Sequence, residues 1–448
     1  IAPENVEVCA LALYSDFDET GNFECSDALL NKLQSNIIWS GKSNFVDIPT
    51  DCPQRDERMG WTGDISVFAR TACFDFDLSA FLEKWLSDVR AEQGRGGGLP
   101  LVVPKQGISA PTVATACWAD CIVLVPWAEY LARGDKELLR AMYAAMKKYL
   151  KAVRFWASLS GPGKYRRHIW KWLFQFGDWC APEGGIFDWM KRGKWIATAY
   201  YANSCRIVSK IADILEKKKD VAYYAGLSEK IAASFRHVFT DGKGKLKSEF
   251  QTGYVLPLVF GIVDGAERES MAQNLDRLVR ERRYHLSTGF TGTPHILFAL
   301  ADGGKAETAY KLLLQDTAPS WLACIKEGAT TTWEEWTIDP KKEGNIPSYN
   351  HYAYGAVGDF LYCRVAGIEP TEGGYKCFSV RPVLGGGLTY AKASVKTPYG
   401  TAASEWHLDG GKFSLKVTVP VSCTCRVTMP SGKQMTLKSG EYEMEEAV

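Results

Sequence analysis

The chain has 448 residues, of which 46% are hydrophobic and 23% are charged, so it is an ordinary globular protein with room for one large domain and a smaller one. Its formal net charge of +1 gives no electrostatic reason to expect nucleic acid or an anionic membrane as a partner. No apolar run approaches the roughly 18–20 residues that span a bilayer, so we expect no membrane segment.

The first 22 residues precede the helical part of the chain. They open with Ile1 rather than Met, and "IAPENVEVCALALYSDF" alternates like the last strand of an earlier unit. We therefore expect residues 1–22 to be the end of a preceding β-domain or a linker strand. A targeting signal would then lie outside the given sequence, which leaves both a cytoplasmic and a periplasmic location open.

Residues 23–371 have the apolar spacing of helices. Stripes at helical spacing occur at residues 29–38, 138–153, 208–215 and 231–239. Ser26 stands where the N-cap of the first of these helices is expected. Long loops that contain Gly, Pro and Trp, such as "GRGGGLPLVVPKQG" and "FGDWCAPEGGIFDW", separate the helices, and loops of this length are usually functional.

Residues 372–448 show a period of two instead. Two alternating runs follow one another, Phe413, Leu415, Val417 and Val419, then Val421, Cys423, Cys425, Val427 and Met429. The turn sequences "GGG", "DGG" and "PSGK" separate the runs of this region. This part of the chain is predicted to be an antiparallel β-sandwich domain whose strands bury one face.

The thirteen cysteines are scattered without the spacing of a zinc site or of a redox CxxC motif. We expect buried free thiols that pack as small hydrophobic side chains, which favours a reducing compartment. The sequence therefore predicts no metal site and no cofactor.

The stretch "TDCPQRDERMGWTGD", residues 50–64, gathers opposed charges around one tryptophan. Pro53, Gly60 and Gly63 break regular structure, so its side chains should radiate from a loop. A neutral polyol is bound by carboxylates that accept from adjacent hydroxyls, by arginine donors and by an aromatic face. The residues that offer these groups are Asp51, Arg55, Asp56, Glu57, Arg58, Trp61 and Asp64. The alternative interpretation is a structural network of ion pairs.

Other charged and aromatic stretches lie downstream. In "KEGATTTWEEW" the adjacent Glu334 and Glu335 should point apart, so only one of them can face the same site as Trp333. In "SYNHYAYGAVGDF" His351 is assigned a binding role, because a lone histidine is more often a donor than a catalyst. Trp179 in "FGDWC" can line the same site. Glycosidic cleavage needs two carboxyl groups on opposite faces of the sugar, and these stretches offer them.

Several stretches resemble the signatures of the α-L-rhamnosidases of glycoside hydrolase family 78. They are "DCPQRDERMGWTGD", "TGFTGTPHILFALADGG", "GATTTWEEW", "NHYAYGAVGDFLY" and "GGGLTYAKASVKTPYG". The resemblance runs from about residue 20 to the C-terminus. It implies a mainly α fold, an (α/α)6 toroid barrel of six helical hairpins, with β-sandwich domains before and after it.

The resemblance also implies residue roles in the inverting release of terminal α-L-rhamnose. Glu57 matches the general acid and Glu334 the general base, and in an inverting enzyme their carboxyl groups are about 6.5–9.5 Å apart. With the residues chosen on chemical grounds, the expected substrate-binding set is Asp51, Arg55, Asp56, Trp61, Asp64, Trp179, Trp333 and His351. The sequence departs from the family pattern at Glu335, usually arginine, and at Thr337, commonly aspartate. A carboxylate beside Glu334 is expected to weaken it as a base.

Two other functions are compatible with these residues. One is a different glycan-active enzyme with the same barrel, a phosphorylase or another glycosidase, since a fold does not decide a reaction. The other is a rhamnose-binding protein with weak catalysis. The expected partner is a small-molecule or oligosaccharide rhamnoside, and the sequence carries no signal for its aglycone, its linkage or the oligomeric state.

Overall fold

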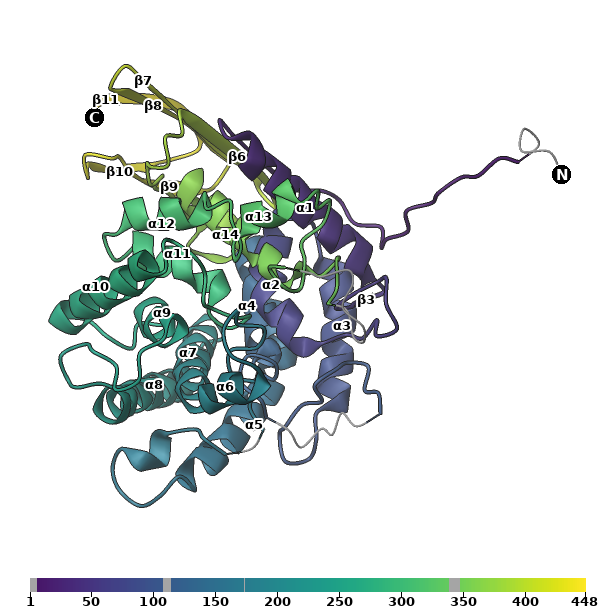
Figure 1. Cartoon of the computed structure of the whole chain (residues 1–448), viewed down its shortest axis with the longest axis vertical. Helices are drawn as coiled ribbons and strands as arrows, with labels where there is room; N and C mark the ends of the chain where they lie inside the picture. The colour runs from purple at the N-terminus through teal and green to yellow at the C-terminus, as the bar shows by residue number, and fades with distance from the viewer. Residues whose placement is uncertain (1–5, 108–113, 173, 338–346) are drawn as a thin grey trace.

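The computed structural model describes residues 6–107, 114–172, 174–337 and 347–448. Most of the chain forms a large helical body, and a smaller β-domain lies beside it at the end of the molecule that holds the C-terminus (Figure 1). The first of the described residues run away from this body as an extended segment, and residues 6–18 belong to no strand (Figure 1).

The helical body is built from helices that follow one another along the chain. They are α1 (Ala28–Asn44), α2 (Thr62–Asp75), α3 (Ser79–Glu92), α4 (Cys121–Arg133), α5 (Lys136–Ser158), α6 (Ile186–Lys191), α7 (Gly193–Ile214), α8 (Lys218–Phe239), α9 (Gln251–Val259), α10 (Gly265–Glu281), α11 (Thr293–Ala301), α12 (Ala306–Leu313), α13 (Trp321–Lys326) and α14 (Gly358–Phe360). A 3-10 helix, Tyr352–Val357, precedes α14, and a π-helical turn, Leu361–Val365, follows it. The four predicted apolar stripes lie in α1, α5, α7 and α8.

The helices form an inner and an outer layer. α4, α9 and α11 bury nearly every residue, as helices do when protein surrounds them on all sides. By contrast α10, which packs against α9, buries only the stripe Met271, Ala272, Leu275 and Val279. The pairs α7 with α8, α9 with α10 and α11 with α12 pack against each other as hairpins. This is the two-layered arrangement that a toroid of helical hairpins requires.

The predicted N-cap of the first helix is wrong by one residue. Asp27 caps α1, because its Oδ1 accepts hydrogen bonds from the backbone N–H groups of Leu29 and Leu30, each at 2.9 Å. The hydroxyl of Ser26 accepts instead from the backbone N–H of Thr389 at 2.9 Å. Ser26 therefore joins the helical body to the β-domain.

The β-domain consists of two sheets. Its strands are β1 (Gly21–Cys25), β4 (Ile368–Pro370), β5 (Cys377–Val380), β6 (Tyr390–Thr397), β7 (Gly400–Asp409), β8 (Lys412–Val419), β9 (Thr424–Thr428), β10 (Gln434–Leu437) and β11 (Gly440–Ala447). The first sheet has the order β1-β6-β7-β8-β11 and is antiparallel throughout. The second has the order β10-β9-β5-β4, in which β5 and β9 run parallel, so the antiparallel prediction holds for one sheet only.

The burial pattern of these strands tests the predicted alternation. Phe413, Leu415, Val417 and Val419 face the core from β8, as predicted. Val421 does not belong to the next strand. Its side chain is 73% exposed, and a turn that contains Ser422 at a φ of +60° delays the start of β9 to Thr424.

The N-terminal strand connects the two ends of the chain. β1 spans the proposed boundary at residue 22 and pairs with β6, with Phe23 opposite Ala393. The division into residues 1–22, 23–371 and 372–448 remains a proposal.

No helix within the described ranges is long and apolar enough to cross a membrane. All thirteen cysteines are free and twelve of them are buried, as expected from their spacing.

A buried carboxyl group lies where the helical body meets the β-domain. Oδ1 of Asp75, at the end of α2, accepts from Gln34 Nε2 at 2.7 Å and from the Tyr362 hydroxyl at 2.9 Å. Its backbone carbonyl accepts from the N–H of Thr20 at 2.8 Å, just before β1. Burial raises the pKa of Asp75 to about 7, although both side-chain hydrogen bonds oppose the shift.

Candidate active site

The acidic stretch 50–64 forms a closed loop between α1 and α2. A short hairpin, β2 (Phe45–Val46) and β3 (Ile48–Pro49), leads into it. Asp51 closes the loop on Met59, since its N–H donates to the Met59 carbonyl at 2.9 Å and its Oδ1 accepts from the Met59 N–H at 2.8 Å. Gly60 lies against the backbone of Val103, where a Cβ would be 2.1 Å from the carbonyl oxygen. The loop conformation is therefore fixed by backbone contacts.

Glu57 projects from this loop and is held by two donors. The Arg55 Nη2 lies 2.6 Å from its Oε2, and the Trp61 indole Nε1 donates to its Oε1 at 2.7 Å. The side chain of Glu57 remains 28% exposed, so a ligand can reach it. Both carboxylate oxygens are thus oriented before any substrate binds.

Glu334 approaches the same guanidinium from the loop that follows α13. Its Oε2 lies 3.1 Å from Arg55 Nη1 and accepts from the backbone N–H of Ser348 at 2.8 Å. Its own N–H donates to the Ser348 carbonyl at 2.9 Å. The hydroxyl of Ser348 accepts from Gln54 Nε2 at 2.9 Å, which fastens this loop to the acidic one.

Arg55 therefore joins the two candidate catalytic carboxylates, 277 residues apart in the sequence. The terminal nitrogens of a guanidinium are only about 2.3 Å apart, so the Oε2 atoms of Glu57 and Glu334 are separated by at most about 8 Å. The separation that allows a water molecule between the carboxyl groups of an inverting glycosidase is about 6.5–9.5 Å. The geometry is compatible with that mechanism.

Asp64 and His351 form a buried pair beside this cluster. Asp64 lies in the first turn of α2, and its Oδ1 is 3.0 Å from Nε2 of His351, which precedes the 3-10 helix Tyr352–Val357. The Ala353 N–H points at Nδ1 of His351 and favours a neutral ring, but at 3.4 Å this contact is weak. Although burial opposes the charged form, the hydrogen bond to Asp64 and the carboxylates of Asp64, Glu334 and Asp51 raise the pKa of His351 to about 9.

Asp51 lies beside Arg55 and is the last charged residue of this site. Its carboxylate is 3.9 Å from Arg55 Nη2 and is almost fully buried. Burial, and then the neighbouring charge of Asp64, raise the pKa of Asp51 to about 6. Asp51, Arg55, Glu57, Asp64, Glu334 and His351 are called the charged cluster below.

An aromatic wall flanks the charged cluster, and its centre was missed in the sequence. The ring of Phe176 contacts those of Trp61 at 6.0 Å, Trp118 at 4.4 Å and Trp179 at 5.0 Å between centroids. The predicted Trp61 and Trp179 are thus brought together by a phenylalanine. The only signal for Phe176 was the aromatic spacing of "WLFQFGDW".

Two predicted residues lie outside the cluster. Asp56 is fully exposed, and its nearest cation is Arg58 at 3.8 Å. Its neighbours Arg55 and Glu57 both turn into the cluster, so the residue between them points the other way. Trp333 packs edge-on against Tyr349, with 5.2 Å between the ring centroids. The binding roles suggested for Asp56 and Trp333 remain predictions.

The adjacent Glu335 influences the same buried groups as Glu334. Burial raises the pKa of the Cys180 thiol, and the charges of Glu334 and Glu335 raise it further. Glu335 also raises the pKa of the buried Tyr354 hydroxyl, after burial and the charges of Cys180 and Asp178. The charges of both carboxylates of this pair therefore act on Cys180 and Tyr354.

A cation already lies among the atoms that resemble a metal site. Asp51, Cys52 and Glu57 offer ligand atoms within 4.8 Å of one another. Arg55 contacts all three residues, with Nε 3.3 Å from the Cys52 sulfur and Nη2 2.6 Å from Glu57 Oε2 and 3.9 Å from Asp51 Oδ2. The guanidinium thus supplies positive charge at this position.

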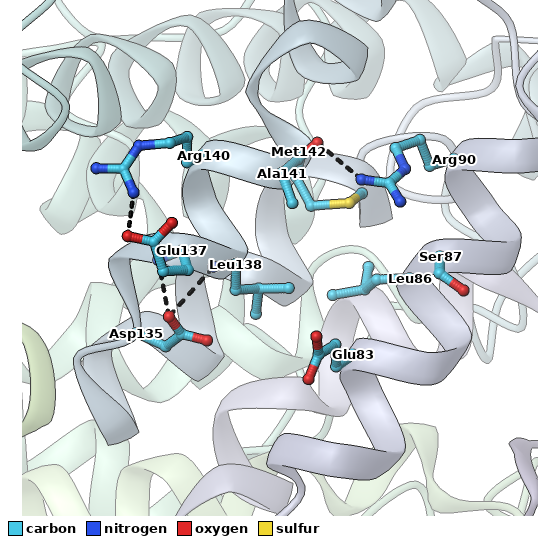
Figure 2. A pocket seen from close by; sticks show the side chains of 10 residues that line it. All are labelled: Glu83, Leu86, Ser87, Arg90, Asp135, Glu137, Leu138, Arg140, Ala141 and Met142. Atoms are coloured by element: carbon cyan, nitrogen blue, oxygen red, sulfur yellow. Dashed lines mark hydrogen bonds and ion pairs between the residues drawn. The ribbon is translucent and has the colours of Figure 1, made fainter.

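A separate pocket of about 400 Å³ lies between α3 and α5 (Figure 2). Several of its charged groups form interactions within α5 or between α3 and α5. Asp135 Oδ1 caps α5 by accepting from the N–H groups of Glu137 and Leu138 at 2.7 and 3.2 Å, Glu137 pairs with Arg140, and Arg90 donates to the Ala141 carbonyl at 3.2 Å. No member of the charged cluster lines this pocket.

Two carboxylates beside an aromatic wall, carried by a toroid of helical hairpins, are features of the six-hairpin glycosidases. Comparison with known protein families places the chain in this class. Residues 18–365 match the model of the bacterial α-L-rhamnosidase six-hairpin glycosidase domain, and residues 367–443 match that of the bacterial α-L-rhamnosidase C-terminal domain. The chain therefore belongs to the bacterial α-L-rhamnosidase family. The predicted family and the (α/α)6 fold with its C-terminal β-domain are confirmed.

Individual relatives share this similarity over most of the chain. An α-L-rhamnosidase of Formosa agariphila is 38% identical over 97% of this chain and 47% of its own length, and one of Streptomyces avermitilis is 37% identical over 96% and 40%. The crystal structure of an α-L-rhamnosidase from Aspergillus terreus matches with a TM-score of 0.89 at 35% identity, over 96% of this chain and 50% of that one. The chain thus spans less than half the length of these two curated relatives.

An α-L-rhamnosidase of Streptomyces avermitilis has been solved in complex with L-rhamnose. That structure matches with a TM-score of 0.87 at 35% identity, over 97% of this chain and 43% of that one. The bound sugar is a property of that protein, and it bears on this chain only as support for the proposal that follows.

Proposed function

We propose that this chain hydrolyses terminal α-L-rhamnosides by a single displacement that inverts the anomeric carbon. The observation that carries the proposal is the convergence of Glu57 and Glu334 on the one guanidinium of Arg55. Family membership supports glycoside hydrolysis as the reaction. The solved relative in complex with L-rhamnose supports rhamnose as the sugar that is released. The substrate is a small-molecule or oligosaccharide rhamnoside.

In this mechanism the two carboxyl groups act on opposite faces of the sugar. Glu334 accepts a proton from a water molecule as the water oxygen attacks the anomeric carbon. Glu57 takes up a proton from solvent once the sugar separates it from Arg55, and it gives that proton to the departing glycosidic oxygen. Because Arg55 contacts both carboxylates in the free protein, the sugar must take over part of its position when it binds. Arg55 then stays beside Glu334 and balances its charge.

The remaining groups suit a 6-deoxy sugar. Asp51 and Asp64, the latter paired with His351, offer buried acceptors for ring hydroxyls. Trp61 and Trp179, joined through Phe176, offer flat apolar faces for the C–H groups and for the methyl group at C6. A site that combines polar groups for the ring hydroxyls with an apolar face for the C6 methyl distinguishes rhamnose from a sugar that bears a hydroxyl at C6.

The test is the release of nitrophenolate from p-nitrophenyl α-L-rhamnoside, with and without phosphate. We expect release that does not depend on phosphate, and much slower release from the matched α-L-mannoside, which differs only by its C6 hydroxyl. Release that requires phosphate would indicate phosphorolysis instead. Binding of rhamnose without any release would leave a sugar-binding protein, and the hydrolase proposal would fail.

A further inference from the structure

Two aromatic side chains of the loop between α5 and α6 face solvent. Phe174 is 41% exposed and Trp172 is 44% exposed, whereas Phe176 in the same loop is buried. The exposed part of each ring leaves apolar surface in water. A ring in such a position calls for a reason other than packing.

The backbone on both sides of Phe174 is held by buried polar groups. The hydroxyl of Thr115 donates to the Phe174 carbonyl at 2.9 Å. Gln175 accepts from the Ala116 N–H at 2.9 Å and donates to the Trp172 carbonyl at 3.4 Å. Thr115 and Gln175 are both buried. The backbone from which Phe174 projects is therefore held in place by these hydrogen bonds.

A chain of ring contacts leads from Phe174 to the proposed general acid. The Phe174 and Phe176 centroids are 4.8 Å apart in an edge-on contact, and Phe176 contacts Trp61. Trp61 in turn donates its indole N–H to Glu57 at 2.7 Å. In glycoside hydrolysis the acid protonates the departing oxygen, so the aglycone lies on the side of Glu57. Phe174 thus extends the aromatic wall on the leaving-group side.

We propose that Phe174 is a specificity-determining platform that binds the aglycone of the rhamnoside. This inference rests on the proposed function. The ligand it fits is a ring with a flat apolar face, either the C–H face of a second sugar or a phenolic ring, which stacks on the exposed aromatic side chain. Rhamnosides with a ring as aglycone are therefore preferred over those with a small alkyl group.

The experiment compares three substrates in the purified protein. They are methyl α-L-rhamnoside, p-nitrophenyl α-L-rhamnoside and a disaccharide with α-L-rhamnose at its non-reducing end, all followed by the rhamnose released. In Phe174→Ala we expect kcat/KM to fall at least about fivefold for the ring aglycones, mainly through KM, and to change less than about twofold for the methyl glycoside. Loss with only one ring aglycone identifies which of the two rings the platform binds.

Two further variants control for fold and for ring chemistry. Phe174→Tyr keeps the ring and should retain the wild-type preference. Tyr399, between β6 and β7, is 40% exposed like Phe174 but lies in the β-domain, so Tyr399→Ala should leave all three substrates unaffected. Equal loss on all substrates in Phe174→Ala, or no loss on any, would overturn the inference. Absence of rhamnose release by the wild-type protein would instead overturn the proposed function on which it rests.

Discussion

Arg55 is the side chain on which the site geometry depends. Its terminal nitrogens lie 2.6 Å from Glu57 and 3.1 Å from Glu334, while its Nε contacts the sulfur of Cys52 at 3.3 Å. A lysine would present all its donors on one nitrogen and draw both carboxylates to that single atom, whereas a guanidinium offers donors on separate nitrogens in a fixed fork. The fork fixes how far apart the two carboxylates are when the site is empty.

The roles of Glu57 and Glu334 can be distinguished by comparing substrates whose leaving groups differ in their need for a proton. With the methyl glycoside, Glu57→Gln and Glu334→Gln should each lower kcat by at least about 10²-fold, the usual scale of general acid–base catalysis. With a dinitrophenyl glycoside, Glu57→Gln should recover most of its activity, because this aglycone departs without a proton. Glu334→Gln should remain slow, since its water still needs a base.

The measurement is the initial rate of each variant on both substrates. Asp56→Asn is the matched control, because Asp56 is a neighbouring carboxylate that faces solvent. It should keep nearly wild-type rates on both. If Glu57→Gln stayed equally slow with the dinitrophenyl glycoside, Glu57 would not be the acid.

At the scale of elements, the loop that carries Phe176 and Trp179 is fixed by one buried carboxylate. Oδ1 of Asp178 accepts from the Gly289 N–H and from the Thr291 hydroxyl, both at 2.9 Å. Its Oδ2 accepts from the Thr252 hydroxyl at 2.7 Å. The Trp179 carbonyl accepts from the Phe290 N–H at 2.8 Å. Asp178 therefore has a structural role and positions the aromatic wall without belonging to it.

Removing this carboxylate should loosen the wall. Asp178→Ala leaves three buried donors without their acceptor, so the free energy of unfolding should fall by about 2–4 kcal/mol. KM for rhamnosides should rise, because Trp179 loses its support. Urea unfolding checks the first effect, with Asp188→Ala as control, since Asp188 is an exposed acid of α6 that pairs with Lys191. Equal unfolding midpoints for the two variants would remove the structural role of Asp178.

The elements differ in how far the sequence predicts them. The helices α1, α5, α7 and α8 follow from apolar periodicity, because one buried face repeats every turn. The parallel pairing of β5 with β9 does not, because periodicity reports the buried face of a strand and not the direction of its neighbour. Val421 was misplaced for a related reason, since the turn at Ser422 has no mark in the hydrophobic pattern.

The candidate site likewise contains residues that the sequence predicts and residues that it does not. Motif and chemistry were enough to predict Glu57, Glu334, Asp64 and His351, which the fold brings together. They could not show that Asp56 points to solvent, because that depends on the backbone direction of an irregular loop. Phe176 was missed because a lone phenylalanine in a loop looks like core packing until the fold places Trp61 and Trp179 on either side of it.

At the scale of the whole molecule, Asp75 makes the junction of the two domains sensitive to pH. Its pKa of about 7 in the folded protein lies above the ordinary value of 3.8, so the folded state binds this proton more tightly than the unfolded chain. The contribution of Asp75 to the free energy of unfolding is therefore full below about pH 4 and is lost as the pH rises through 7.

Asp75→Asn should remove this dependence. The amide keeps an oxygen to accept from Gln34 and Tyr362, and its nitrogen takes the place of Oδ2, which has no hydrogen-bond partner. We expect the variant's Tm, relative to wild type, to be higher at pH 8 than at pH 5. The exposed Asp409→Asn serves as control and should shift Tm equally at both values. A difference between Asp75→Asn and wild type that does not change with pH would show that Asp75 is not protonated by burial.

The measurement closest to the central claim is proton NMR of the first sugar released from an α-L-rhamnoside, before the anomers equilibrate. Attack by a water molecule held at Glu334, on the face opposite Glu57, predicts that β-L-rhamnose forms first and the α-anomer follows by mutarotation. Initial release of α-L-rhamnose would contradict the account, because retention requires a covalent intermediate that a water-separated pair of carboxylates does not form.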